Sequence, residues 1–447
     1  MTIHAEPRIQ RPAPAAAGIP FAITDSAKVP AGRYFSPEFA RLEKEKLWTH
    51  VWQMACRLDE IPRPGDFVEY QINDQSIIVV RQRDDTVKAY FNACRHRATA
   101  LGVGTGSFHG GQIVCPYHGW RWNLDGSNSY VYAERGFAAR CLEPESLRLA
   151  DCQVGELFGL VWINMDLTAP PLLEAMAGIA EALAPIGFER MQVRWWRHLI
   201  LPGNWKVAQE AFMEAYHVMQ AHPSLAMGAS DEDFNLDAFG GSFECFDGGH
   251  SHMLPVSGEI PVAGMSAADY FVQYNNALYF GTDAYATERE MFIQQGLLER
   301  DIDPEQFPLA FFGALYEYAK GAGIDLPAPP TNTSGYAHIF PNITVLPAYG
   351  NSIMYRVRPN GDDPESCVFE VWALQIPAAG EEKTDRPELE GPIPVEDWPQ
   401  ILKEDFHNII AQQKGLKTQG LDELTLSEPY EAMIVNSHRT IDQYLAR

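Results

Sequence analysis

Between residues 52 and 165 the chain alternates apolar and polar positions in short runs. The runs are DFVEYQI, QSIIVVRQ, VKAYFNAC, GQIVCPY and GLVWINM, and residues such as Gly, Pro, Asn and Asp separate them. Alternation with period two between turn-forming residues is typical of half-buried β-strands. This part of the chain therefore predicts a small all-β domain, which we bound at residues 51–169.

Other patterns flank this β-rich part. Residues 1–30 are rich in Pro and Ala and predict a flexible N-terminal arm. A helix is expected over residues 36–48, because Ser36 is a suitable N-cap and Pro37 suits the first helical position. Residues 228–266 are rich in Gly, Ser and Asp and predict long surface loops, which at that length are often a functional lid or mouth.

From residue 172 onward long helices alternate with strands. The clearest helix is predicted from residue 205 to about 219, and a final helix from near residue 395 past 413. Residues 335–376 predict three strands. The resulting fold class is α+β: an all-β domain inserted into a larger domain, residues 31–50 and 170–447, with an antiparallel sheet and long helices.

Composition narrows the partners and the compartment. At 447 residues the chain is long enough for two domains, and its net charge of −25 argues against nucleic acid or an anionic membrane as a partner. We find no apolar run long enough to span a membrane and no signal-peptide core near the N-terminus. Scattered cysteines indicate buried thiols in a reducing, cytoplasmic compartment; they are Cys56, Cys141, Cys152, Cys245 and Cys367.

Two short motifs, Cys94-Arg-His96 and Cys115-Pro-Tyr-His118, lie on predicted turns of the β domain. Structural zinc sites usually repeat C-x-x-C or H-x(3–5)-H pairs, whereas each of these motifs supplies one thiol and one imidazole. This order lets the arms give two thiolates to one iron and two imidazoles to the other iron of a [2Fe–2S] cluster, which raises its reduction potential. A structural zinc site is the alternative.

A second group of candidate ligands lies at the end of the predicted helix 205–219. Glu214 and His217 are three residues apart and share a helical face, whereas His222 is five residues further and does not. If both histidines bind one metal, the helix must end or bulge between them. Two imidazoles and one carboxylate form the facial triad of non-haem Fe(II) oxygenases. Two unrelated core histidines are the alternative.

With both groups present, the chain resembles the α (catalytic) subunit of Rieske non-haem iron oxygenases, the ring-hydroxylating family. The resemblance implies a Rieske domain at residues 51–169 inside a helix-grip (SRPBCC/START-like) catalytic domain. It implies a [2Fe–2S] cluster on the Cys and His motifs and a mononuclear Fe(II) on His217 and His222, with Glu214 bridging the two metal sites. The family's third iron ligand matches Asp405, with Glu404 as the alternative, whereas His407 is not expected to bind metal.

The chain also departs from the family pattern in this region. Most ring-hydroxylating dioxygenases have Asp at the position of Glu214, and many have Asn at the position of Ala211. Glu214 and the shorter spacing from Asn204 resemble the branch that contains carnitine and choline oxygenases. Glu210 and Glu214 are expected to raise one another's pKa if both are buried.

The resemblance implies a terminal oxygenase that hydroxylates an aromatic or other hydrophobic small molecule with O2, as a dioxygenase or a monooxygenase. Electrons are expected from a ferredoxin or flavin reductase. A head-to-tail homotrimer, with or without a β subunit, is also implied. A demethylase or quaternary-amine monooxygenase is the first alternative, and an electron-transfer Rieske protein is the second. A basic patch for the electron donor is expected from Arg81, Arg83, Arg95 and Arg97. An apolar lining for the substrate is expected from Phe212, Met213 and Met219. His250 and His252 are expected to be exposed loop histidines.

Overall fold

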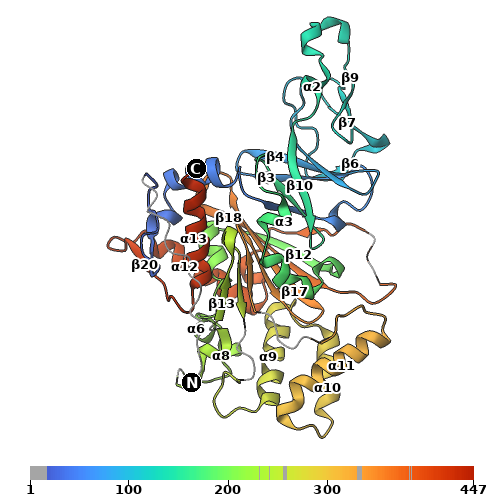
Figure 1. The fold of residues 1–447 in the computed structure, drawn as a ribbon. Helices are drawn as coiled ribbons and strands as arrows, with labels where there is room; N and C mark the ends of the chain where they lie inside the picture. Colours follow the sequence, from blue (N-terminus) through green and yellow to red (C-terminus); the bar gives the residue numbers. More distant parts are fainter. Residues whose placement is uncertain are drawn as a thin grey trace. The chain divides into compact units, whose positions relative to one another are not determined.

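A computed structural model describes residues 18–230, 232–240, 242–254, 259–329, 335–381, 383 and 385–447 (Figure 1). Its contacts divide the chain into two compact units. The first unit contains Met1–Glu43, Met176–Glu382 and Glu388–Arg447, and the second contains Lys44–Ala175 with Lys383–Pro387. The main part of the second unit, Lys44–Ala175, is therefore inserted into the first.

The second unit is built from two antiparallel sheets. One has seven strands in the order β2-β11-β10-β5-β4-β3-β6, and the other has three in the order β7-β8-β9. The predicted run DFVEYQI forms β3 without a shift of bounds. The strands are β2 (Gln53–Arg57), β3 (Asp66–Ile72), β4 (Gln75–Arg81), β5 (Val87–Phe91), β6 (Thr105–Ser107), β7 (Gln112–Val114), β8 (Arg121–Asn123), β9 (Asn128–Tyr130), β10 (Asp151–Leu157) and β11 (Leu160–Asn164), with short helices α2 (Pro144–Leu147) and α3 (Leu172–Ala175).

The first unit is organised around an eight-stranded sheet in the order β13-β14-β15-β16-β17-β18-β12-β19. All neighbours are antiparallel except β12 and β19. The strands are β12 (Gln192–Leu201), β13 (Ser242–Cys245), β14 (Ser251–Leu254), β15 (Ala337–Ile339), β16 (Ile343–Pro347), β17 (Asn351–Asn360), β18 (Asp363–Gln375) and β19 (Leu389–Glu390), and a separate pair joins β1 (Lys28–Pro30) to β20 (Glu423–Thr425).

Helices cover this sheet and extend from it. Helix α5 packs on β17 and β18, and α12 packs on both α5 and α9, while α9, α10 and α11 form a group of their own (Figure 1). The helices are α1 (Pro37–Leu42), α4 (Ile179–Leu183), α5 (Trp205–Glu210), α6 (Val218–Ala221), α7 (Pro223–Ala226), α8 (Leu236–Gly240), α9 (Ala267–Thr282), α10 (Glu288–Leu298), α11 (Phe307–Gly321), α12 (Gln400–Gly415) and α13 (Ala432–Leu445). Among the described helices, none has both the length and the apolar content to cross a membrane.

Three predicted elements differ from the structure. The helix 205–219 is not continuous, because α5 ends at Glu210 and α6 begins only at Val218. The strands of 335–376 number four rather than three: the first divides at Pro341, which has no N–H to continue the ladder. The segment 228–266 is not all loop, because it contributes α8 and the sheet strands β13 and β14.

The ends of the chain also differ from prediction. The predicted helix 36–48 begins as expected, since the Ser36 hydroxyl accepts a bond from the Phe39 N–H, but its second half is a π-helical turn. Helix α12 is not the last, because α13 follows it. Of the predicted flexible arm, residues 1–17 lie outside the described residues, whereas Lys28–Pro30 form β1 and pair with β20.

Candidate functional site: two metal centres

The segment between α5 and α7 turns the chain so that two histidines converge. Asn204 caps α5, its side chain accepting a hydrogen bond from the Lys206 N–H. After the helix breaks, the Glu214 carboxylate accepts a 3.0 Å bond from the His217 N–H and so fixes a tight turn. Helix α6 is one turn long, and its C-cap His222 is followed by Pro223, which begins α7. The end of α6 at Ala221 lies between the two histidines, as the sequence required, and the earlier break after Glu210 was not predicted.

His217, His222 and Asp405 present their ligand atoms to a single point. The Nε2 atoms of His217 and His222 are 3.3 Å apart. The Asp405 Oδ1 atom lies 3.4 Å from His217 Nε2 and 3.1 Å from His222 Nε2. All three ligand atoms lie within 4.8 Å of one another. The side chains of His222 and Asp405 are 2% and 5% exposed, whereas that of His217 is 24% exposed. The side of the site next to His217 is therefore more open than the side next to His222 and Asp405.

Each histidine is held from behind by its own carboxylate. The Glu214 Oε1 atom is 2.5 Å from His217 Nδ1, and the Glu404 Oε2 atom is 2.8 Å from His222 Nδ1. Carboxylates in this position fix the tautomer and the orientation of a metal-binding imidazole. Because Glu404 and Asp405 are adjacent on α12 and point about 100° apart, only Asp405 reaches the ligand point. Sequence reasoning kept Glu404 as an alternative ligand and missed this supporting contact.

The electrostatics of the triad suit a cation. Burial lowers the pKa of His217, but hydrogen bonds to Asp405 and Glu214 outweigh burial and raise it to about 10. Burial raises the pKa of Asp405, but its bonds to His217 and His222 bring the pKa below its ordinary value. Because an imidazole must lose its proton to bind a metal, a proton and a metal ion compete for His217. Two imidazoles, one carboxylate and two supporting carboxylates fit a mononuclear iron.

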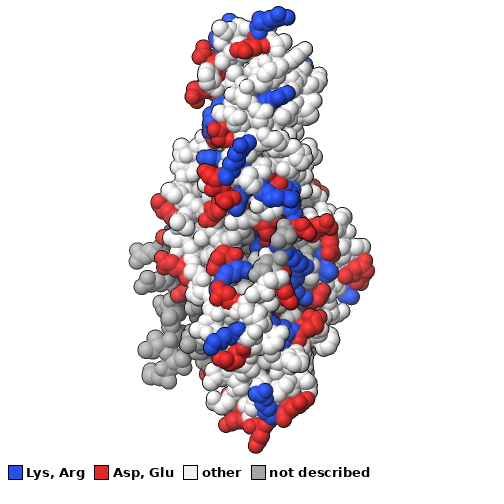
Figure 2. Space-filling view, turned by 90° about the vertical axis from the view of Figure 1, so that its right-hand side faces the viewer, with Lys and Arg blue, Asp and Glu red and all other residues white. Residues whose placement is uncertain are grey.

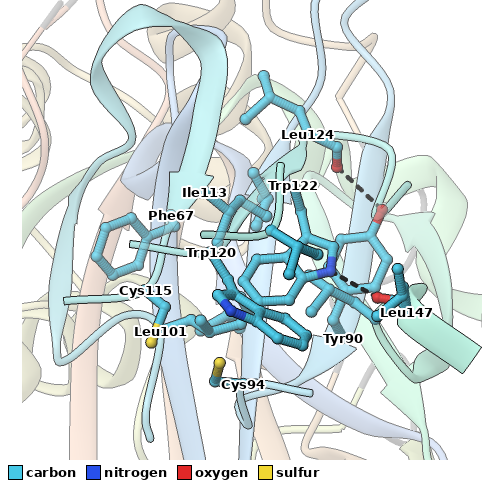
Figure 3. Close-up of a cluster of buried hydrophobic side chains, with 14 residues drawn as sticks. Phe67, Tyr90, Cys94, Leu101, Ile113, Cys115, Trp120, Trp122, Leu124 and Leu147 are labelled. Carbon is cyan, nitrogen blue, oxygen red and sulfur yellow. Dashed lines mark hydrogen bonds between the residues drawn. The ribbon is translucent and has the colours of Figure 1, made fainter. Parts of the chain in front are cut away.

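The cysteine motifs lie at the edge of the buried core of the second unit. Cys94 and Cys115 are 4% and 1% exposed, and their sulfur atoms lie side by side beneath Trp120 (Figure 3). Two bonds fix this core: the Tyr90 hydroxyl donates to the Leu124 carbonyl, and the Trp122 indole to the Leu147 carbonyl (Figure 3). Backbone N–H groups of the first loop point at the Cys94 sulfur. The core therefore holds both thiols in fixed positions.

The two imidazoles of these motifs also face one another. The ring centroids of His96 and His118 are 4.5 Å apart, and His96 stacks on Trp120 at 4.9 Å. The Nδ1 atom of His96 is buried without a hydrogen-bond partner among the described residues. A buried polar atom without a partner is costly unless something binds it. Among the described residues, the ligand atoms of His217, His222 and Asp405 all lie within 4.8 Å of one another, whereas those of the two cysteines and two histidines do not form such a compact group. Their wider spacing suits a two-iron cluster better than a single zinc ion.

A buried polar network adjoins α5 and was not foreseen. The Tyr34 hydroxyl lies 2.9 Å from both Glu210 Oε2 and His438 Nε2, and the Arg33 Nε–H donates to His438 Nδ1 at 3.0 Å. Burial raises the pKa of Glu210 to about 8, against the opposing effects of Tyr34, Lys206 and Arg33. Burial is thus the main cause here, not the expected repulsion from Glu214.

The remaining candidate residues have more ordinary positions. His250 and His252 are buried in and beside β14, so their expected exposure is wrong, and His407 is exposed and pairs with Glu396. Phe212 packs on Tyr355 and Phe369 within the core. The other expected residues are placed as follows: Met213 buried, Met219 half-buried, Arg81 paired with Asp85, Arg95 bonded to the Ser146 carbonyl, Arg97 over the Tyr117 ring and Arg83 beside Gly111.

Comparison with known sequences gives two family matches and several relatives. The profile of the ring hydroxylating alpha subunit (catalytic domain) matches residues 188–447, and that of the Rieske [2Fe–2S] domain matches residues 51–138. The carnitine monooxygenase oxygenase subunit of Acinetobacter baumannii is 30% identical over 197 residues, which are 43% of this chain and 52% of that protein. The chain thus spans about half the length of such curated relatives. The large oxygenase component of a 2,4-dinitrotoluene dioxygenase system from Burkholderia sp. is 28% identical over 326 residues, 71% of this chain and 64% of that protein.

Solved structures share the fold over nearly the whole chain. A naphthalene 1,2-dioxygenase bound to phenanthrene has a TM-score of 0.65 at 20% identity, covering 96% of this chain and 94% of that one. A quaternary ammonium Rieske monooxygenase has a TM-score of 0.63 at 19% identity, covering 94% and 96%. These identities show the fold alone. Because the catalytic-domain profile covers more than half of the chain, this protein belongs to the family of ring-hydroxylating oxygenase α subunits, which combine a Rieske [2Fe–2S] cluster with a mononuclear iron.

Proposed function

We propose that this protein is the terminal oxygenase component of a system that hydroxylates a small organic molecule with O2. The convergence of His217, His222 and Asp405 in a chain that also carries a Rieske domain is the observation that supports this most. An electron-carrying Rieske protein needs no such triad and no catalytic domain. Dihydroxylation adds both oxygen atoms of O2 with two electrons and two protons, whereas monooxygenation adds one atom and releases the other as water.

The residues of the site divide the tasks of this reaction. When bound, the iron supplies open coordination positions for O2 beside the substrate. His217, His222 and Asp405 would hold it on one face. Glu214 and Glu404 would keep both imidazoles oriented with their Nδ1–H groups directed away from the metal. Cys94, Cys115, His96 and His118 would hold the cluster, whose imidazole ligands raise its potential and favour its reduction by an external donor.

Electron input requires an exposed part of the cluster arms. Tyr117 is 61% exposed beside His118, and the Arg97 guanidinium lies over its ring. On the face shown in Figure 2, basic and acidic side chains are interspersed, and neither sign forms a broad patch. A ferredoxin or flavin reductase would recognise this exposed part of the cluster arms, where Tyr117 and Arg97 lie. The seven cysteines form no disulfide, which supports a reducing, cytoplasmic setting.

Electron output would cross a subunit boundary in a head-to-tail homotrimer. Glu214 is the candidate bridge, since it holds His217 and would accept a bond from His118 of a neighbouring copy. Mixed trimers of Cys94→Ala and His217→Ala chains test this, because each mixed pair combines one intact cluster with one intact iron site. Recovery of O2-dependent product formation, absent from either parent trimer, is expected. No recovery in confirmed mixed trimers would exclude transfer between subunits.

A second candidate reaction is oxidation of a quaternary amine with loss of a methyl group or a side chain. The carnitine and glycine betaine monooxygenase subunits among the relatives favour it, as does Glu214 in place of Asp. Mass spectrometry of reaction mixtures separates the outcomes. Dihydroxylation adds O2 and two hydrogens, monooxygenation adds one oxygen, and demethylation removes a methyl group. Metal analysis should give about three irons per chain for any of these reactions; two irons would instead indicate an electron carrier.

A further inference from the structure

Five tyrosines gather near the triad, and we name them the phenol cluster: Tyr270, Tyr274, Tyr285, Tyr336 and Tyr355. The first two lie on α9, where their rings stack at 5.8 Å. Tyr285 follows α9, Tyr336 precedes β15 and Tyr355 lies on β17. The cluster therefore draws on α9, on β17 and on the residues next to α9 and β15.

Packing and charge both place the phenol cluster beside the proposed iron ligands. Tyr274, Tyr285 and Tyr336 pack on an apolar group that includes Met213, Val218 and Ile401. These apolar residues flank Glu214, His217 and Asp405 along the chain. Burial, and then the charges of Tyr355, Asp405, Tyr274 and Glu214, raises the pKa of the Tyr336 phenol.

The pKa values of the other phenols are raised as well. Burial and the charge of Asp405 raise the pKa of Tyr355. Burial raises the pKa of Tyr274 most, and the charges of Tyr285 and Tyr270 raise it further. Packing agrees with this grouping, since Tyr270 stacks on Tyr274, Tyr274, Tyr285 and Tyr336 share one apolar group, and Tyr355 packs on Phe212 next to Met213.

The hydroxyls of the phenol cluster make no hydrogen bond to any other residue that the structure describes. Tyrosines elsewhere in the chain behave differently. The Tyr90 hydroxyl donates to the Leu124 carbonyl, and the Tyr349 hydroxyl donates to the Pro327 carbonyl. Four of these tyrosines are only half-buried, and none of the five hydroxyl oxygens is among the fully buried polar atoms that lack a partner. The hydroxyls are therefore unpaired and still accessible, so that a bound molecule can supply the acceptors they lack.

We propose that the phenol cluster recognises the substrate, and that the substrate is a small molecule with hydrogen-bond-accepting oxygens rather than a bare hydrocarbon. This inference rests on the proposed oxygenase function and specifies its substrate class. Phenol rings supply apolar faces for a carbon skeleton, while their hydroxyls donate to carbonyl, ether or carboxylate oxygens. A hydrocarbon would leave those donors unpaired, and a site built to hydrogen-bond its substrate rejects an analogue that lacks the acceptor.

The test measures binding without turnover, on the full-length holoenzyme with both metal centres loaded. Isothermal titration compares acetophenone with ethylbenzene, which differ by one carbonyl oxygen, and adds benzoate and carnitine as charged acceptors. Wild-type enzyme should bind at least one acceptor-bearing probe about tenfold more tightly than ethylbenzene. Tyr274→Phe and Tyr336→Phe should each weaken that binding about five- to tenfold, the effect of one lost hydrogen bond.

Ethylbenzene and a control variant separate recognition from general damage. The same Phe variants should leave ethylbenzene binding unchanged or tighter, because they remove a donor that this probe cannot satisfy. Tyr349→Phe, whose hydroxyl already has an internal partner, should change neither probe. The proposal is overturned if no acceptor-bearing probe binds more tightly than ethylbenzene, or if the Phe variants weaken both classes equally. Absence of O2 uptake with every compound would instead count against the oxygenase function, while the binding comparison would still stand.

Discussion

Replacing Glu210 by Gln should stabilise the protein at alkaline pH and leave it nearly unchanged at acidic pH. The carboxyl is buried, and its pKa is about 8 in the fold against an ordinary value of 4.5. Between these pH values the folded chain holds a proton that the unfolded chain has released, so stability falls as pH rises. The destabilisation is absent below about pH 4.5, grows through the interval and is complete above about pH 8.

The magnitude follows from the size of the shift. A difference of 3.5 (8 minus 4.5) corresponds to about 5 kcal/mol at most, at 1.36 kcal/mol per pKa unit. Glutamine keeps the shape and can bond to Tyr34 and His438, but it carries no titrating proton. Relative to wild type, E210Q should therefore gain several kcal/mol at pH 8.5 and close to nothing at pH 5.

Urea denaturation followed by tryptophan fluorescence at pH 5.0, 6.5 and 8.5 measures this difference. Glu299→Gln, on the exposed end of α10, is the matched control and should give the same small difference at every pH. The reasoning fails if the difference between E210Q and wild type is constant over this range. It fails equally if wild-type stability rises between pH 5 and pH 8.5 while that of E210Q does not.

Three further predictions concern the metal site and its surroundings. Asp405→Ala should lower the iron content from about three to about two per chain while the visible spectrum of the cluster persists; three irons in this variant would refute the ligand assignment. Glu404→Gln should weaken Fe(II) binding about 10- to 100-fold in a chelator competition, because His222 loses the carboxylate that orients it. Lys206→Met should cost about 3–5 kcal/mol in urea denaturation by leaving the buried Glu43 carboxylate without its cationic partner. A second change, Glu43→Gln, should recover most of that loss, and no recovery would contradict the explanation.

Local sequence patterns predicted the features that depend on neighbouring residues. Alternation identified β3 and the strands beside it, and the spacing of Cys94, His96, Cys115 and His118 identified the cluster motif. The convergence of His217 and His222 was expected, but the position of the helix break was not. That break depends on Glu214 turning back to cap the His217 N–H, which helix periodicity does not reveal. The ligand roles themselves stay a prediction.

Features that depend on distant residues were missed. Glu404 contacts His222 from 182 positions away, and Arg33 contacts His438 from 405 positions away, so no short pattern links them. The strands β13 and β14 were taken for loop because Gly, Ser and Asp dominate their surroundings, although pairing with β15 holds them in the sheet. The tyrosines of the phenol cluster are spread from α9 to β17, and only the fold brings them together.

The pairing of β1 with β20, and of Arg33 with His438 and Asp442, sets an order of events during synthesis. The first unit cannot close until α13 has left the ribosome, about 400 residues after Arg33. At about 5–20 residues per second, the N-terminal segment waits roughly 20–80 s for its partners. Nearly all of the second unit, Lys44–Ala175, is complete long before then. Maturation of the iron–sulfur centre can thus begin on the nascent chain, before the catalytic iron has a place to bind.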